Sequence, residues 1–222
     1  MKMRSQIIID LINNKINITQ AMDTLKILLN DIDNPEIKNW LLKEIDGYNQ
    51  DDDIPKYRIV PATITGEYLA SYGRIHAKKH PIPIDPQYIA DWNSVKIFAG
   101  INEIYQFSLA EQKEDCHHLS ISLHPVLVNQ IAMIDGEVLE AHQDLSIYAY
   151  TNIIGKLKEI ILDILLKLEK EYGNLDSYYI EFENDEKEKQ TINYIISIID
   201  NSIKFGDKNT IKNSNIGDEN EN

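Results

Sequence analysis

Apolar residues recur every three or four positions through residues 1–46, and this period is typical of amphipathic helices. We therefore predict three short helices. Thr19 is the expected cap of the second helix. The third has the clearest ends, because Asn34 can cap it, Pro35 suits its first turn and Gly47 suits its stop. Its predicted buried face consists of Ile37, Trp40, Leu41 and Ile45.

From Tyr57 to Tyr150 apolar and polar residues alternate instead, which predicts β-strands. Pro61 limits the first strand to an edge or a bulge, because proline cannot donate to a sheet ladder. The expected extended segments are residues 56–70, 94–100, 118–124 and 136–150.

Three segments between these strands carry other signals. Residues 80–87 contain three prolines, so we predict an irregular crossing there rather than a sheet element. Residues 101–107 are expected to form a short helix. Pro125 can begin another helix, which Gly136 would stop.

A long amphipathic helix follows, capped by Thr151 or Asn152 and ended by Gly173. Its apolar positions alternate spacings of three and four and form a stripe wider than a coiled-coil seam. We therefore expect this helix to pack on the sheet or on the first three helices. The main domain is predicted to span residues 1–173.

Residues 174–203 are expected to form an acidic linker and a further amphipathic helix. Tyr178, Ile180 and Phe182 alternate in the linker and can add an edge strand. The apolar stripe of the helix needs a partner surface, so we predict self-association through it. The stripe consists of Ile192, Ile195, Ile196, Ile199 and Ile203.

Residues 204–222 form a polar tail rich in asparagine and glycine, which we expect to be flexible. Together these patterns predict an α+β fold. It comprises an N-terminal three-helix segment, a central mixed or antiparallel sheet, a long C-terminal amphipathic helix, an extra helix and the tail.

Charge and cysteine content narrow the function classes. A formal net charge of −14 disfavours nucleic acid and anionic membranes as partners, because phosphates would be repelled. Cys116 is the single cysteine, which excludes an intrachain disulfide framework and every multi-cysteine zinc pattern. The apolar run at the N-terminus is broken by Asp10, unlike a signal peptide, and no stretch has the length of a membrane span. We expect a cytoplasmic protein.

Asp51, Asp52 and Asp53 form the most acidic loop of the chain. They lack the alternating order and the closing glutamate of a calcium hand. Adjacent carboxylates also repel one another and point in different directions. We interpret the loop as a solvated connector between a helix and a strand, with no metal site.

The alternating segment 118–124 places His118, Ser120 and His124 on one face together with Ser122. These side chains are weak candidates for a catalytic dyad that lacks an acid. More often such a row is the wet face of a half-buried strand. No other catalytic signature occurs, so a non-enzymatic function is favoured.

One basic cluster stands out on this acidic chain and is the best place for an anionic partner. It consists of Arg74, His76, Lys78, Lys79 and His80. Zinc binding by the two histidines would need a helix, and the flanking glycine and prolines disfavour one. In an extended segment the two side chains would be roughly 13 Å apart. We expect no metal and no cofactor.

The flanks of the acidic loop carry a family resemblance. The three predicted helices end in Trp40-Leu41-x-x-Glu44-Ile45-Asp46-Gly47-Tyr48, and the strand region opens with Ile54-Pro55-x-Tyr57-Arg58-Ile59-Val60-Pro61-Ala62-x-Ile64-Thr65-Gly66. With the long helix of residues 152–171, this arrangement resembles the AbiTii-like family of abortive-infection proteins from bacterial phage defence. The resemblance covers residues 5–173.

The resemblance implies a role in which infected cells halt phage production, in some cases beside a small companion protein. It supplies no catalytic residues. We expect an adaptor or sensor that acts through protein contacts, with a companion defence protein or a phage component as partner, and as a homo-oligomer. Two alternatives stay open. One is a toxin-type enzyme, a nuclease or other hydrolase. The other is an antitoxin-like protein that neutralises a companion.

Overall fold

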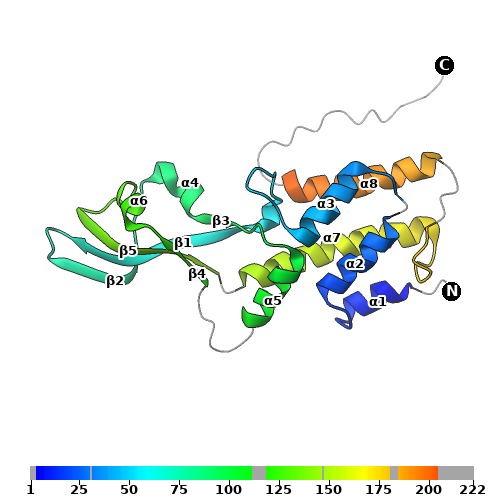
Figure 1. The fold of residues 1–222 in the computed structure, drawn as a ribbon, viewed down its shortest axis with the longest axis horizontal. Helices are drawn as coiled ribbons and strands as arrows, with labels where there is room; N and C mark the ends of the chain where they lie inside the picture. Colours follow the sequence, from blue (N-terminus) through cyan, green and yellow to red (C-terminus); the bar gives the residue numbers. More distant parts are fainter. Residues whose placement is uncertain (1–3, 31, 112–118, 147, 181–184, 205–222) are drawn as a thin grey trace, which may run out of the picture.

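The chain folds into a helical body from which a β-sheet arm projects (Figure 1). The computed structural model describes residues 4–30, 32–111, 119–146, 148–180 and 185–204. The helices of the body are α1 (Gln6–Ile12), α2 (Ile18–Leu28), α3 (Pro35–Asp46), α5 (Ile101–Glu111), α7 (Ala149–Tyr172) and α8 (Asp185–Lys204). This arrangement confirms the predicted α+β fold.

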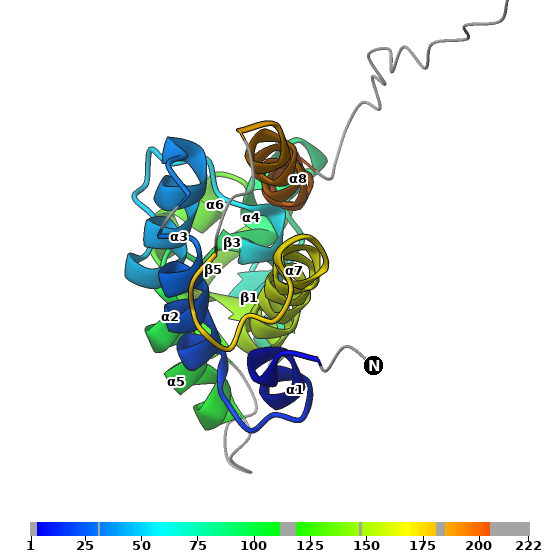
Figure 2. The same cartoon turned by 90° about the vertical axis from the view of Figure 1, so that its right-hand side faces the viewer.

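Helix α7 forms the spine of the body, since it contacts α1, α2, α5 and α8 (Figure 2). Its inward stripe is fully buried at Ile153, Leu157, Ile161 and Ile164. The predicted wide stripe therefore packs on the first helices, as expected. The N-cap is Tyr148 rather than Thr151 or Asn152, so the helix begins at Ala149, and it ends before Gly173 as predicted.

The ends of the short helices follow local capping chemistry. Helix α3 is capped by Asn34, whose Oδ1 accepts a hydrogen bond from the Ile37 backbone N–H at 3.0 Å. Gly47 ends it with a φ of 103°, as predicted. Helix α2 is capped by Asn17 instead of Thr19, because Asn17 and Gln20 form a reciprocal capping box.

The arm is an antiparallel sheet, which resolves the predicted choice between mixed and antiparallel pairing. Its strands lie in the order β2-β1-β5-β4, and β3 pairs with the start of β1. Their bounds are Ile59–Ala70 for β1, Ile75–Pro81 for β2, Ser94–Lys96 for β3, Leu119–Leu123 for β4 and Gly136–Leu145 for β5. Pro61 lies where β1 pairs with β3 alone, so its missing N–H breaks no ladder to β5.

Several predictions for the arm are wrong. The strand expected at residues 94–100 ends at Lys96, the one expected at 136–150 ends at Leu145, and no strand was expected where β2 lies. Residues 80–81 belong to β2, so the irregular crossing begins only at Ile82, before η2 (Pro86–Tyr88) and α4 (Ile89–Trp92). The helix that begins at Pro125 is the short α6 (Pro125–Asn129) and stops well before Gly136. It stops there because the Asn129 side chain binds the backbone N–H and C=O of Val138 on β5, at 2.8 and 3.1 Å.

Body and arm have separate hydrophobic cores. The arm core is small and lies under α6 and the crossing. Its buried residues are Ile64, Ile82, Ile84, Val128, Ile131, Val138 and Ala141. Strand β1 belongs to both parts, because Val60 and Ala62 pack in the body core and Ile64 packs in the arm core.

The predicted isoleucine stripe of α8 has a partner surface within the chain. Ile195 and Ile199 are buried in the body core, and Ile192 and Ile196 pack against it. The side chain of Ile203 lies outside the described residues. The segment before α8 also docks on the body, since Leu175 and Ile180 are buried, but residues 177–180 form no strand. Phe182 and residues 205–222 lie outside the described residues as well.

Candidate functional site

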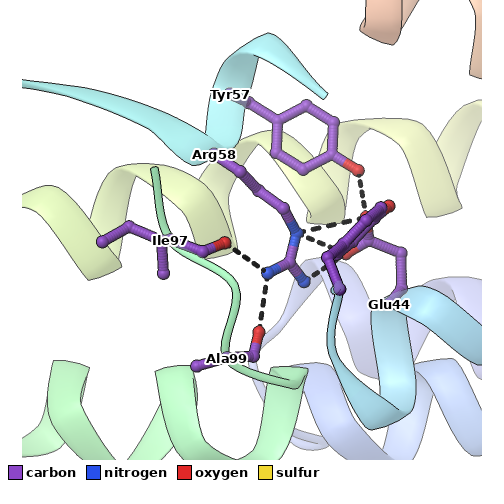
Figure 3. A network of polar contacts seen from close by, with 6 residues as sticks. Glu44, Tyr57, Arg58, Ile97 and Ala99 are labelled. Atoms are coloured by element: carbon purple, nitrogen blue, oxygen red, sulfur yellow. Dashed lines mark hydrogen bonds and ion pairs between the residues drawn. The ribbon is translucent and has the colours of Figure 1, made fainter. Parts of the chain in front are cut away.

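Four side chains from the two halves of the family motif meet at the junction of body and arm. Glu44 comes from α3, Tyr48 follows that helix, and Tyr57 and Arg58 belong to η1 (Lys56–Arg58), which leads into β1. Both members of the Glu44–Arg58 ion pair are fully buried. We call this set of four residues the junction network (Figure 3).

Each side-chain nitrogen and oxygen atom of the ion pair has at least one hydrogen-bond partner. Arg58 Nη2 donates to Glu44 Oε2 at 2.7 Å, and Arg58 Nε lies 3.2 Å from the same oxygen. The hydroxyls of Tyr48 and Tyr57 donate to Glu44 Oε1 at 2.5 and 2.6 Å. Arg58 Nη1 donates to the backbone carbonyls of Ile97 and Ala99, at 3.2 and 2.6 Å. A buried pair needs this degree of satisfaction to offset its loss of hydration.

The network shifts the pKa values of its two tyrosines and of Arg58. Burial, followed by the adjacent Glu44 carboxylate, raises the pKa of Tyr48 and of Tyr57 far above the ordinary tyrosine value, so both stay neutral donors. Burial alone would lower the pKa of Arg58, but the attraction of Glu44 raises it above its ordinary value. The guanidinium also stacks over the Tyr48 ring, with its carbon 4.8 Å from the ring centroid.

Backbone contacts close the junction around these side chains. The Tyr48 N–H donates to the Phe98 carbonyl at 2.8 Å, and the Ile97 N–H donates to the Arg58 carbonyl at 2.8 Å. A Cβ on Gly47 would lie 2.7 Å from the Phe98 carbonyl oxygen, so only glycine fits this approach. The motif therefore anchors the root of β1 to α3 and to the segment that follows β3.

The acidic loop is a connector on one side of this junction, as interpreted from the sequence. Asp51 and Asp53 are exposed. Asp52 accepts from Lys43 Nζ at 2.8 Å and from the Asn49 N–H at 2.7 Å, and these hydrogen bonds lower its pKa. The loop lines a shallow pocket of about 400 Å³ together with Trp40 and α8. Within the described residues, no three metal-ligating side chains gather anywhere.

The serine and histidine row is divided by the fold. His118 lies outside the described residues, and His124 caps α6 through its Nδ1. Ser120 is exposed on β4 and donates to Asp144 on β5, which also accepts from Thr65 Oγ1 at 2.6 Å. The register places His142 opposite Ser122 on this same face. An acid therefore does adjoin the row, although it lies on an open sheet surface.

Sequence reasoning missed Asp144 and His142 as neighbours of Ser120. Their alternation with buried residues in β5 marks them as one polar face, but it does not reveal which strand lies beside them. Glu44 was also missed as a buried residue. Glu44 is four residues from both Trp40 and Tyr48, which places it on the face of the helix toward the core. This spacing could have indicated that Glu44 is buried.

The basic cluster lies along β2 and the turn before it, and all five side chains are exposed. Part of its charge is paired within the arm. His76 Nε2 lies 2.5 Å and Lys78 Nζ 3.3 Å from Glu67 Oε1 on β1, and the hydrogen bond from His76, followed by that from Lys78, lowers the pKa of Glu67. His76 and His80 face opposite sides of the sheet, because the ladder has a bulge between them at Lys79, whose φ is 50°.

A comparison with family models matches residues 2–194 to the AbiTii family. No curated protein and no solved structure gives a significant match. The described residues contain no helix that is long and apolar enough to cross a membrane. The match runs beyond Gly173 into α8, consistent with the packing of that helix on the body. Because the match covers most of its length, the chain belongs to the AbiTii family, which indicates a role in abortive infection against phage.

Proposed function

We propose that this protein acts in abortive infection as a protein-interaction module, an adaptor or sensor whose arm presents a binding surface to a companion defence protein. The junction network supports the proposal. Its buried charges hold the root of the arm at a fixed place on the body, and the ion pair is enclosed rather than open to a substrate. A rigid root lets the distant end of the arm meet a partner with little loss of conformational entropy.

The tip of the arm, the turn Ser71–Gly73 with Arg74, has the features of a contact surface. Tyr72 is 92% exposed. It has a φ of 56°, and Ser71 has a φ of 52°, so two non-glycine residues occupy the left-handed region. Such strain is often stored at functional sites. Tyrosine and arginine are also, with tryptophan, the side chains enriched at interface hot spots.

Co-purification with the product of the neighbouring gene tests this proposal. We expect the wild-type chain to capture that protein, and a variant with Tyr72→Ser and Arg74→Ser to capture at least tenfold less. The same variant should lose protection in a plaque assay. Ile12→Ser with Ile27→Ser, at exposed positions on the body, is the matched control and should retain both activities. Full capture and protection by the arm-tip variant would refute the proposal.

A toxin-type effector enzyme is the second candidate, and the contact of Ser120 with Asp144 is the observation that favours it. Induced expression in uninfected cells separates the two functions. Growth arrest that is abolished by Ser120→Ala and by Asp144→Asn, in variants that still fold, would support an enzyme. Arrest that is also lost with His118→Ala or His124→Ala would assign a histidine as the base. Normal growth with the wild-type protein speaks for the interaction module.

A further inference from the structure

The two edges of the arm sheet differ in how they are protected against a further strand. The outer edge of β2 carries Lys78, a bulge at Lys79 and Pro81, which are the usual devices against edge pairing. Strand β4 forms the other edge, and among the described residues it pairs with β5 alone (Figure 1). Its residues 119–123 contain no charge, no proline and no bulge.

The sequence of β4 reads the same in both directions, Leu119-Ser120-Ile121-Ser122-Leu123. A second β4 laid antiparallel beside it, with Ile121 on the two-fold axis, would place Ile121 opposite its own copy. Leu119 would then lie opposite Leu123, and Ser120 opposite Ser122. Each side chain would meet one of like polarity on the same face of the sheet.

From these observations we propose that two copies of the chain associate through β4. The pairing is isologous, because the same strand is used by both copies. It would join the two arms into one continuous sheet in the order β2-β1-β5-β4, followed by the same strands of the second copy in reverse. A second copy of the chain is thus a partner distinct from the companion protein, and the pairing of β4 does not depend on that companion.

The uncharged edge of β4 and its apolar exposure favour a second copy as the occupant. The chain carries a net charge of −14, yet no charged side chain of β4 would face its counterpart, whereas two β2 edges would oppose lysines. Ile121 is 43% exposed and gains a partner on the axis. On α6, directly after β4 in the chain, Val126 and Leu127 are 58% and 51% exposed.

The interface is small, and we expect a transient dimer with a dissociation constant on the order of 10–100 µM. Each copy is strongly acidic, so their mutual repulsion opposes association. Added salt should therefore strengthen the dimer by screening that repulsion.

Disulfide trapping in the full-length chain tests the register. Cys116 is first replaced by serine. Ile121→Cys should then form a covalent dimer, because directly opposed Cβ atoms lie about 4.5–5.5 Å apart, close to disulfide geometry. Ser120→Cys alone should cross-link at least tenfold more slowly, since its own copy lies diagonally at about 7–8 Å. A mixture of Ser120→Cys and Ser122→Cys should give the mixed dimer.

The matched control is Ile75→Cys on β2, which is 52% exposed and should not form a covalent dimer faster than Ser120→Cys. Equal trapping of all four cysteine variants would overturn the proposal, and so would faster trapping of Ser120→Cys than of Ile121→Cys.

Sedimentation velocity from 5 to about 500 µM provides the second measurement, on the concentration scale of a weak interface. Wild-type and Ile75→Lys chains should dimerise, and Ile121→Lys should stay monomeric with an unchanged melting temperature.

A chain truncated after Lys204 should dimerise like the full-length chain, since β4 lies outside the removed segment. A wild-type chain that remains monomeric up to 500 µM, or an Ile121→Lys chain that still dimerises, would overturn the proposal. Capture of the companion by the arm tip is read in a separate assay. Failure of the β4 dimer and failure of the interaction-module function are therefore distinguishable.

Discussion

At the scale of single residues, the junction network accounts for four positions of the family motif by one physical requirement. A charged pair taken out of water must find every hydrogen-bonding partner inside the protein. Glu44 finds them in Arg58 and two tyrosine hydroxyls, and Arg58 finds the rest in two backbone carbonyls. Removing one member leaves the others buried and unsatisfied.

We therefore predict that Arg58→Met destabilises the protein by about 3–5 kcal/mol, since it leaves the Glu44 carboxylate buried without its counter-charge. The double variant Glu44→Leu with Arg58→Met should cost less than the sum of the single variants. Urea denaturation measures both. Lys43→Met breaks the more exposed Lys43–Asp52 pair and should cost at most about 1 kcal/mol. A similar cost for Lys43→Met and Arg58→Met would contradict this account of the junction.

A second prediction concerns alkaline pH. The folded-state pKa of Tyr57 lies well above its unfolded value of 10.0. The contribution of Tyr57 to the free energy of unfolding is therefore complete below pH 10 and is lost as the pH rises above 10. In that range the unfolded chain releases the proton first. The loss amounts to about 1.4 kcal/mol per pH unit for each such tyrosine. Tyr57→Phe should start less stable at pH 8, and its deficit should shrink between pH 10 and 11 in urea titrations. A deficit independent of pH would exclude a raised pKa.

At the scale of elements, two glycines differ in whether their position has room for a larger side chain. Gly155 lies on an exposed part of α7, and a Cβ there would meet nothing within 4 Å. Gly66 lies in the centre of β1, where a Cβ would come within 1.9 Å of the Glu140 carbonyl oxygen on β5. The same substitution must therefore have opposite effects at the two positions.

Gly155→Ala should raise stability by about 0.5–1 kcal/mol, because alanine loses less backbone entropy in a helix. Gly66→Ala should lower it by at least about 2 kcal/mol, because the β1–β5 ladder must separate to admit the methyl group. Thermal denaturation of both variants checks the pair. Stabilisation by Gly66→Ala would mean that the two strands are not paired at this register.

At the scale of the whole molecule, two hydrophobic cores of unequal size share one long strand. The body core comprises residues from six helices, whereas the arm core is small and follows the body core along β1 and β5 into the projecting sheet. Fewer buried contacts imply a lower free energy of local opening. The anchored root of β1 limits such opening to the distal part of the arm.

Hydrogen exchange followed by mass spectrometry should show this difference. Amides of β2 should exchange at least tenfold faster than those of the central turns of α7. Val138→Ala, in the arm core, should accelerate exchange in β2 and α6 and leave α7 unchanged. Leu157→Ala, in the body core, should accelerate exchange throughout. Equal acceleration of α7 by both variants would show that the chain opens as one unit.

The sequence by itself determined the local features of this protein. Such features depend on neighbours within one or two turns of the chain. They are the helical and strand periods, the ends of α3 at Asn34 and Gly47, and the end of α7 at Gly173. The AbiTii motif could be recognised for the same reason, and the family match confirms the resemblance. Strand β2, where no strand was expected, could not be recognised, because it forms by pairing with β1. The end of α6 could not be predicted either, because the contact of Asn129 with Val138 sets it.

Only the tertiary structure decided which polar groups meet. Three contacts join residues from separate elements. Glu44 pairs with Arg58, the Ala99 carbonyl after β3 accepts from Arg58, and Ser120 donates to Asp144. Periodicity assigns each residue to a face, but it does not reveal which element covers that face. Packing between elements decides which surfaces stay exposed to partners. The exposed arm tip and the free edge of β4 therefore could not be predicted from the sequence.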